Sequence, residues 1–148
     1  MNYEAYPLLA AEHNTRFQFR SIGKRGIFEK VISFSPLNED IYNLALLDYN
    51  PVTGEESDLS VTDNGDLPKV LATVMKAIRF FLKEYPDRLI YVKGSTDSRT
   101  RLYQISINKV YPLLKNDLIV WGHQNAEWVE VEPNLSFESF LIAKKVLT

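Results

Sequence analysis

The strongest pattern in this chain is an amphipathic helix between Asp66 and Tyr85, and it constrains the fold more than any other segment. One face of this helix is apolar, with Val70, Leu71, Val74, Ala77, Ile78, Phe81 and Leu82. The opposite face is basic, with Lys69, Lys76, Arg79 and Lys83. Asp66 is a favourable N-cap, and Pro68 lies in the first turn, where its missing N–H costs nothing. A helix with one apolar face must bury it, so this pattern predicts a sheet beneath the helix.

The residues before this helix predict antiparallel strands. Arg16–Arg20 alternates polar and aromatic residues with the period of a strand, and the strand pattern resumes over Ile27–Phe34 after a turn at Gly23–Gly26. Tyr42–Tyr49 predicts a third strand, and Glu55–Val61 predicts a fourth. The second and third strands are the more apolar, so we expect them to lie inside the sheet.

The residues after the helix predict a second set of alternating elements. In chain order these are a strand (Leu89–Lys93), a helix (Asp97–Val110) stopped by Pro112, a strand (Leu118–Trp121), a turn (Gly122–Asn125), a strand (Glu127–Glu132) and a final helix (Phe137–Lys145) capped by Ser136. The strand–helix–strand crossover between Leu89 and Trp121 implies a parallel pair. The sequence therefore predicts the α+β class, with a mixed, mainly antiparallel sheet covered by helices in the order ββββ-α-β-α-ββ-α. It predicts a single domain over residues 1–148.

Composition narrows the classes of function. The formal net charge of −2 argues against general binding of nucleic acids or anionic membranes, which needs a strong basic field. The chain has no cysteine, so disulfides and thiolate chemistry are excluded. His13 and His123 have no second ligand at metal-binding spacing, so we expect no metal site. The chain shows no signal peptide and no run of ~20 apolar residues, so we expect a cytoplasmic protein without a membrane partner.

The segment Leu89–Tyr103 comes closest to chemistry, because a strand feeds the N-terminus of a helix where backbone N–H groups and positive side chains meet. The candidate anion-binding residues are Lys93, Gly94, Ser95, Thr96 and Arg99. On a helical wheel with Leu102 at zero, Arg99 falls at about 60°, inside the apolar stripe, whereas Arg101 falls at about 260° and faces solvent. The same residues also fit an ordinary turn, in which Ser95 or Thr96 caps the helix and Arg99 pairs with a carboxylate.

Two resemblances extend this interpretation. The residues Lys93–Thr96 and Arg99–Tyr103, with the strands around them, resemble a family of uncharacterised bacterial proteins known as a domain of unknown function, over most of the chain. The order of elements is similar to that of the GNAT family of N-acyltransferases. In that family the helix after the fifth strand often carries a Leu-Tyr pair, whose tyrosine protonates the coenzyme A thiolate. This resemblance implies acyl-CoA as cofactor and Tyr103 as the acid.

The chain departs from the N-acyltransferase pattern at two places. The stretch Val61–Asp66 stands where that family has a glycine-rich pyrophosphate loop, but it contains one glycine and two carboxylates. Carboxylates at a helix N-terminus repel a pyrophosphate. The tight turn Gly23–Gly26 also replaces the helices that the family has between its first two strands.

Three functional hypotheses follow, and the residues alone do not decide whether the protein is an enzyme. The first is a non-enzymatic module that binds a small anion near Gly94–Arg99, or a protein partner, with a homodimer left open. The second is a divergent acyltransferase. The third is a nucleic-acid-associated protein that uses the basic first hairpin, although Phe17 and Phe19 alternate there as core residues should.

Overall fold

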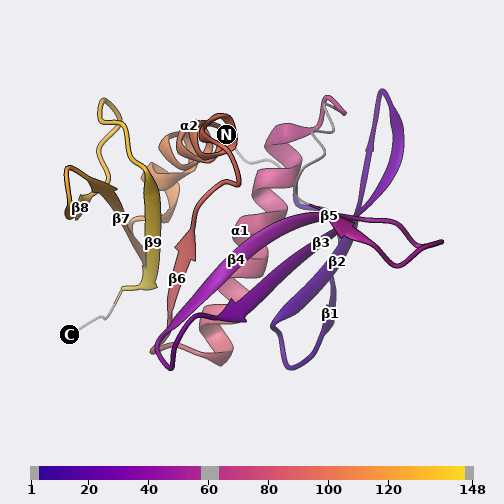
Figure 1. The fold of residues 1–148 in the computed structure, drawn as a ribbon, viewed down its shortest axis with the longest axis horizontal. Coiled ribbons are helices and arrows are strands. Elements are labelled where there is room, and N and C mark those ends of the chain that lie inside the picture. Colours follow the sequence, from indigo (N-terminus) through magenta and orange to yellow (C-terminus); the bar gives the residue numbers. More distant parts are fainter. Residues whose placement is uncertain (1–3, 58–63, 146–148) are drawn as a thin grey trace. The chain divides into compact units, whose positions relative to one another are not determined.

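The computed structural model describes residues 4–57 and 64–145, which contain nine strands and two helices. The elements are β1 (Leu9–Ala11), β2 (Arg16–Gly23), β3 (Gly26–Pro36), β4 (Ile41–Tyr49), β5 (Glu56–Ser57), α1 (Leu67–Glu84), β6 (Leu89–Val92), α2 (Asp97–Leu114), β7 (Leu118–Gln124), β8 (Glu127–Glu130) and β9 (Ser139–Lys144). The strand order is β1-β2-β3-β4-β6-β9-β7-β8, and β5 pairs with β4 (Figure 1). The fold is therefore α+β with a mixed, mostly antiparallel sheet, as the sequence predicts.

The contacts divide the chain into two compact units. Unit 1 contains Met1–Ser35 and Ala45–Glu84, and unit 2 contains Pro36–Leu44 and Tyr85–Thr148. The strand β4 contributes residues to both units. The single domain over residues 1–148 stays a prediction.

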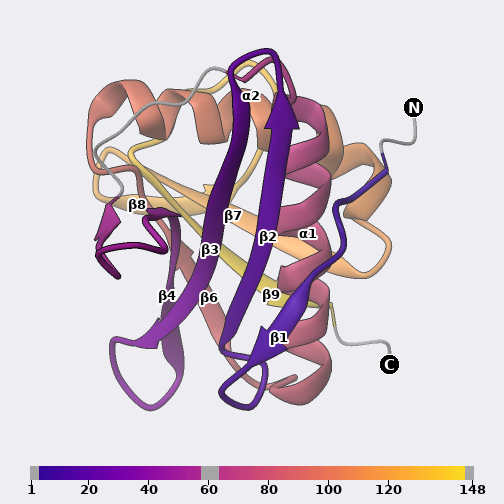
Figure 2. The same cartoon turned by 90° about the vertical axis from the view of Figure 1, so that its right-hand side faces the viewer.

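Unit 1 is built on the predicted hairpin of β2 and β3, with α1 packed against it (Figure 2). Phe17 and Phe19 are buried, so the alternating pattern of β2 turns its aromatic residues inward. Phe34 of β3 stacks on Phe81 of α1 with ring centroids 4.4 Å apart. The ring of Phe34 also packs edge-on against the ring of Phe17. The sequence prediction that α1 covers a sheet is confirmed.

The buried face of α1 also contains a polar residue, Thr73. Its hydroxyl accepts a hydrogen bond from the backbone N–H of Tyr6 at 2.8 Å and donates to the carbonyl of Lys69 at 2.7 Å. The chain before β1 is thereby attached to α1. A polar residue can occupy this face because its hydrogen bonds are satisfied.

Unit 2 contains the main departure from the predicted order. The predicted final helix over Phe137–Lys145 is wrong, because this segment forms β9, which pairs antiparallel with both β6 and β7. The strands β6 and β7 are consequently parallel, as the crossover implies, but β9 lies between them. The parallel neighbour of β6 is β4. A central strand buries both faces, so the run Phe140–Ala143 lacks the period-two signal that distinguishes a strand from a helix.

Two boundaries in unit 2 also differ from prediction. The helix α2 continues past Val110 and includes Pro112. A proline lacks one N–H donor, and this close to the helix end the loss is confined to the final turn, where the N–H of Lys115 still donates to Tyr111 at 2.9 Å. The turn between β7 and β8 is centred on Asn125 and Ala126, which have φ of 50° and 62°, rather than on residues 122–125.

The strand β5 lies within the predicted fourth strand, Glu55–Val61. Residues 58–61 of that prediction lie outside the described part of the chain. No helix within residues 4–57 and 64–145 combines the length and the apolar character that crossing a bilayer requires.

Candidate functional site

The predicted site begins at the end of β6, where Gly94 meets the first turn of α2. The N–H of Gly94 donates to Oγ1 of Thr100 at 3.0 Å. A Cβ atom on Gly94 would lie 2.4 Å from the backbone nitrogen of Thr100, so a glycine is required for this approach. The sequence predicts that Gly94 binds an anion, but the N–H of Gly94 already donates to Thr100 within the protein.

The turn after Gly94 caps α2. Thr96 is the N-cap residue, and its side chain accepts a hydrogen bond from the N–H of Arg99 at 3.2 Å. Asp97 lies in the first turn, where its charge complements the helix dipole. Ser95 and Thr96 are exposed. The predicted strand–turn–helix arrangement is therefore confirmed, and Thr96 is the predicted candidate that caps the helix.

The two arginines of α2 differ in burial in the predicted direction. Arg99 is half-buried and Arg101 is exposed. Thr100 and Ser106 are buried on the side of α2 where the wheel places Arg99, and Leu102, at the zero of the wheel, is 41% exposed. The hydroxyl of Ser106 donates to the carbonyl of Leu102 at 2.7 Å, which allows a polar side chain on the buried face.

A cleft of about 630 Å³ lies in unit 2 beside α2, and we call it the α2 cleft. It is lined by Lys93, Asp97, Thr100, Arg101, Gln104, Ile105, Asn108, Ser136, Phe137 and Glu138. Of the predicted site residues, Lys93 lines this cleft. The predicted residues that are not among its lining are Gly94, Ser95, Thr96 and Arg99. Arg101, which the wheel assigns to solvent, is part of the lining.

Gln104 attaches α2 to the segment before β9. Its Nε2 donates to the carbonyl of Leu135, and its Oε1 accepts from the N–H of Phe137 at 3.0 Å. One side-chain amide thus pairs with both a donor and an acceptor of the backbone. This arrangement holds Ser136 and Phe137 at the cleft.

Sequence reasoning missed Gln104, Ser136 and Phe137 because the sequence pattern of the tail predicts a helix. A signal was present at Gly122, since an isolated glycine in a strand pattern marks a close approach. A Cβ atom on Gly122 would lie 2.2 Å from the ring of Phe137, which therefore packs directly on β7.

The charged groups of the α2 cleft are of both signs. Lys93 and Arg101 form no ion pair with any residue in the described part of the chain. Among the acids, Glu138 contacts His123, with 3.0 Å between Oε2 and Nδ1. The ring of His123 in turn lies 4.9 Å from that of Trp128. His123 is therefore a half-buried residue of β7 and not part of the hairpin turn.

A second cleft of about 310 Å³ lies beside the C-terminal half of α2 and shares Asn108 with the first. The Nδ2 of Asn108 donates to the carbonyl of Pro133 at 3.3 Å, while its Oδ1 is buried without a hydrogen-bond partner among the described residues. Tyr111 donates to Glu130 at 2.9 Å. The pKa of Tyr111 is raised mainly by burial and secondly by this hydrogen bond to Glu130. The polar groups of the second cleft are thus partly used within the protein.

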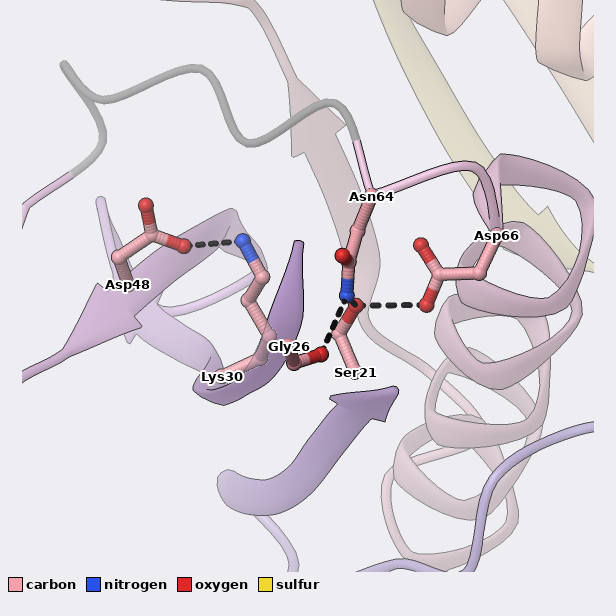
Figure 3. A network of polar contacts seen from close by, with 6 residues as sticks. All are labelled: Ser21, Gly26, Lys30, Asp48, Asn64 and Asp66. Atoms are coloured by element: carbon pink, nitrogen blue, oxygen red, sulfur yellow. Dashed lines mark hydrogen bonds and ion pairs between the residues drawn. The ribbon is translucent and has the colours of Figure 1, made fainter. Parts of the chain in front are cut away.

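In unit 1 a polar network attaches the start of α1 to the first hairpin (Figure 3). Asp66 accepts hydrogen bonds from the hydroxyls of Ser21 at 2.6 Å and Tyr6 at 2.5 Å. The Nδ2 of Asn64 donates to Ser21 at 3.1 Å and to the carbonyl of Gly26 at 3.0 Å. The pKa of Tyr6 is raised mainly by burial and secondly by the hydrogen bond to Asp66. These contacts join three elements of the unit.

The network bears on the acyl-CoA prediction. Asp66 places a carboxylate at the start of α1, where the resemblance to N-acyltransferases implies a pyrophosphate, and residues 61–63 of that stretch lie outside the described part. Tyr103 is half-buried on α2 and is not among the residues lining the α2 cleft. Acyl-CoA chemistry therefore stays a prediction.

Three basic residues of the first hairpin form ion pairs. These pairs are Arg16 with Glu56, Arg20 with Glu29 at 2.6 Å, and Lys30 with Asp48, the last of which is drawn in Figure 3. Each pair offsets a positive charge that a nucleic-acid surface would need. Among the residues that the structure describes, no group of three His, Asp or Glu side chains is arranged to hold a metal ion.

Comparison with known proteins places the chain in a family. The model of a family described as a family of unknown function (DUF6934) matches residues 2–145. Searches of curated proteins and of solved structures found no match. The match covers nearly the whole sequence, as the first resemblance implies, and the chain belongs to the family of unknown function DUF6934.

Proposed function

We propose that this protein is a non-enzymatic binding module whose α2 cleft takes a small ligand through an anionic group. The observation that carries the proposal is the presence of Lys93 and Arg101, unpaired within the described chain, in a cleft of about 630 Å³. This volume is within the range of small-molecule sites. A cation without a protein partner is available to form a charge-assisted hydrogen bond with a carboxylate or phosphate.

The position of the cleft supports the same proposal. Lys93 follows the carboxyl end of β6, which runs parallel to β4. Ligands of sheets with parallel strands bind outside the carboxyl ends of those strands. The hydroxyls of Thr100 and Ser136 line the cleft and supply further hydrogen-bond donors.

The test is a thermal-shift screen followed by calorimetry at low salt, with phosphate, succinate and a nucleoside monophosphate as probes. We expect at least one probe to raise Tm saturably. Arg101→Ala and Lys93→Ala should each weaken its binding about tenfold, which corresponds to about 1.4 kcal/mol. Lys109→Ala is the matched control, because Lys109 is exposed on α2 and lines neither cleft. Equal losses from the control and the cleft variants would overturn the site.

The same screen separates the other hypotheses. Stabilisation by acyl-CoA without a response to simple anions would favour the acyltransferase. A shift with an oligonucleotide that falls steeply with salt would favour nucleic-acid binding. No response to any probe would overturn the small-ligand proposal and favour a protein-interaction module. A cytoplasmic location and a homodimer stay predictions from the sequence.

A further inference from the structure

The α2 cleft carries acidic as well as basic side chains, because Asp97 and Glu138 line it together with Lys93 and Arg101. We propose that its ligand is a zwitterion of the dipeptide class, which places a carboxylate at the two cations and an ammonium group at the two carboxylates. This inference rests on the proposed function and specifies the chemical class of the ligand.

The first support comes from the spacing of Asp97 and Arg101. They lie one helical turn apart on α2, with the acid nearer the N-terminus, which is the order that favours an ion pair on a helix surface. Yet neither side chain forms an ion pair with the other or with anything else in the described part of the chain. Both charges are therefore available to a ligand, at opposite sign and on one face of the helix.

The second support comes from Glu138, which lines the cleft and pairs with His123 through one carboxylate oxygen. The side chain of Glu138 is 69% exposed, so its other oxygen can accept a hydrogen bond from a ligand. A ligand with negative charge alone would meet two carboxylates in the same cleft, and repulsion would offset part of its attraction to the cations. A zwitterion avoids this repulsion, because its carboxylate pairs with the cations and its ammonium group pairs with the carboxylates.

The third support comes from the apolar part of the lining. Phe137 is 6% exposed and anchored against β7, while Ile105 is 44% exposed on α2. An apolar ligand side chain would bury the exposed surface of Ile105. The cleft volume of about 630 Å³ leaves room for a dipeptide with one large side chain.

The experiment compares three forms of one probe by calorimetry: alanyl-phenylalanine, its N-acetyl derivative and its C-terminal amide. Acetylation removes the positive charge, and amidation removes the negative charge, with little change in shape. We expect the free dipeptide to bind at least tenfold more tightly than either derivative. Raised salt should weaken the free dipeptide more than the derivatives.

Variants assign each preference to its side chain. Glu138→Gln and Asp97→Asn should each reduce the preference for the free amine over the N-acetyl form, and Arg101→Ala should reduce the preference for the acid over the amide. Glu127→Gln is the control for the acidic pair, because Glu127 is exposed on β8 and outside the cleft. Glu138 is largely exposed, so its variant tests the proposal even if Asp97→Asn weakens the fold.

The outcomes distinguish the two proposals. If the N-acetyl form or simple anions bind as tightly as the free dipeptide, the zwitterion inference fails and the anion-binding function stands. If simple anions bind and no dipeptide form binds, the inference also fails alone. If neither dipeptides nor simple anions bind, both proposals fail.

Discussion

A Cβ atom on Gly23 would lie 1.9 Å from the backbone oxygen of Asn64, so the end of β2 passes directly against the chain that leads into α1. The same oxygen accepts a hydrogen bond from the N–H of Lys24 at 3.1 Å. Gly23→Ala should therefore lower the free energy of unfolding by about 2–3 kcal/mol, because the backbones must separate and this hydrogen bond is strained or lost. Urea unfolding measures the change.

Gly54→Ala is the control for this substitution. Gly54 has φ of +76° but no atom within 4 Å of its would-be Cβ, so alanine costs about 1 kcal/mol through the left-handed backbone alone. Equal losses at the two glycines would contradict the close approach of Gly23 to Asn64.

Asn64→Ala should destabilise the protein by about 2–4 kcal/mol. The side chain of Asn64 is buried, accepts from the N–H of Arg25 at 2.7 Å and donates to Ser21 and Gly26. Its loss leaves buried groups without partners. Asn38→Ala is the matched control, since the exposed Asn38 makes similar turn contacts that water can replace, and it should cost less than 1 kcal/mol. A similar cost at both positions would contradict the importance of burial.

The raised pKa values of Tyr6 and Tyr111 predict a loss of stability in alkali. The fold favours the neutral phenols, so their contribution is fully present below the unfolded pKa near 10 and is lost as pH rises through the higher folded values. Each tyrosine can add a slope of at most about 1.4 kcal/mol per pH unit. Chemical unfolding at pH 8 to 11 should show a shallower decline for Tyr6→Phe and for Tyr111→Phe. An unchanged decline in the double variant would refute this account.

Gln104→Leu should destabilise unit 2 by about 2–3 kcal/mol, because the carbonyl of Leu135 and the N–H of Phe137 both lose their partner. Gln104→Glu retains an acceptor for Phe137 but brings a second oxygen to the carbonyl of Leu135. When that carboxyl is protonated it can donate, so the deficit of Gln104→Glu relative to the original chain should shrink between pH 7 and pH 4. Thermal unfolding across this range measures it, and a deficit independent of pH would argue against the contact.

Gly122→Ala should destabilise the protein by about 1–3 kcal/mol, because the new methyl group would overlap the ring of Phe137. In a Phe137→Ala background the ring is absent, and the same substitution should be nearly neutral. The pair therefore forms a double-mutant cycle with a coupling energy above about 1 kcal/mol. Additive effects would show that the ring does not occupy this space.

Patterns that span a few neighbouring residues were predicted correctly. The apolar stripe of α1, the β2–β3 hairpin and the Thr96 cap depend on contacts within one turn of a helix or across one tight turn. Burial of the polar residue Thr73 was not predictable in this way, because it is acceptable inside only through specific hydrogen bonds.

The sequence by itself determined the α+β class, the main elements of unit 1 and the strand–turn–helix at Gly94, since local periodicity and capping decide these. Tertiary structure alone decided that β9 enters between β6 and β7 and that Arg101, rather than Arg99, lines the cleft. The physical reason is that a central strand and a cleft wall depend on partners distant in the chain. The pairing of Val92 with Phe140 is one such contact, and no local window contains both residues.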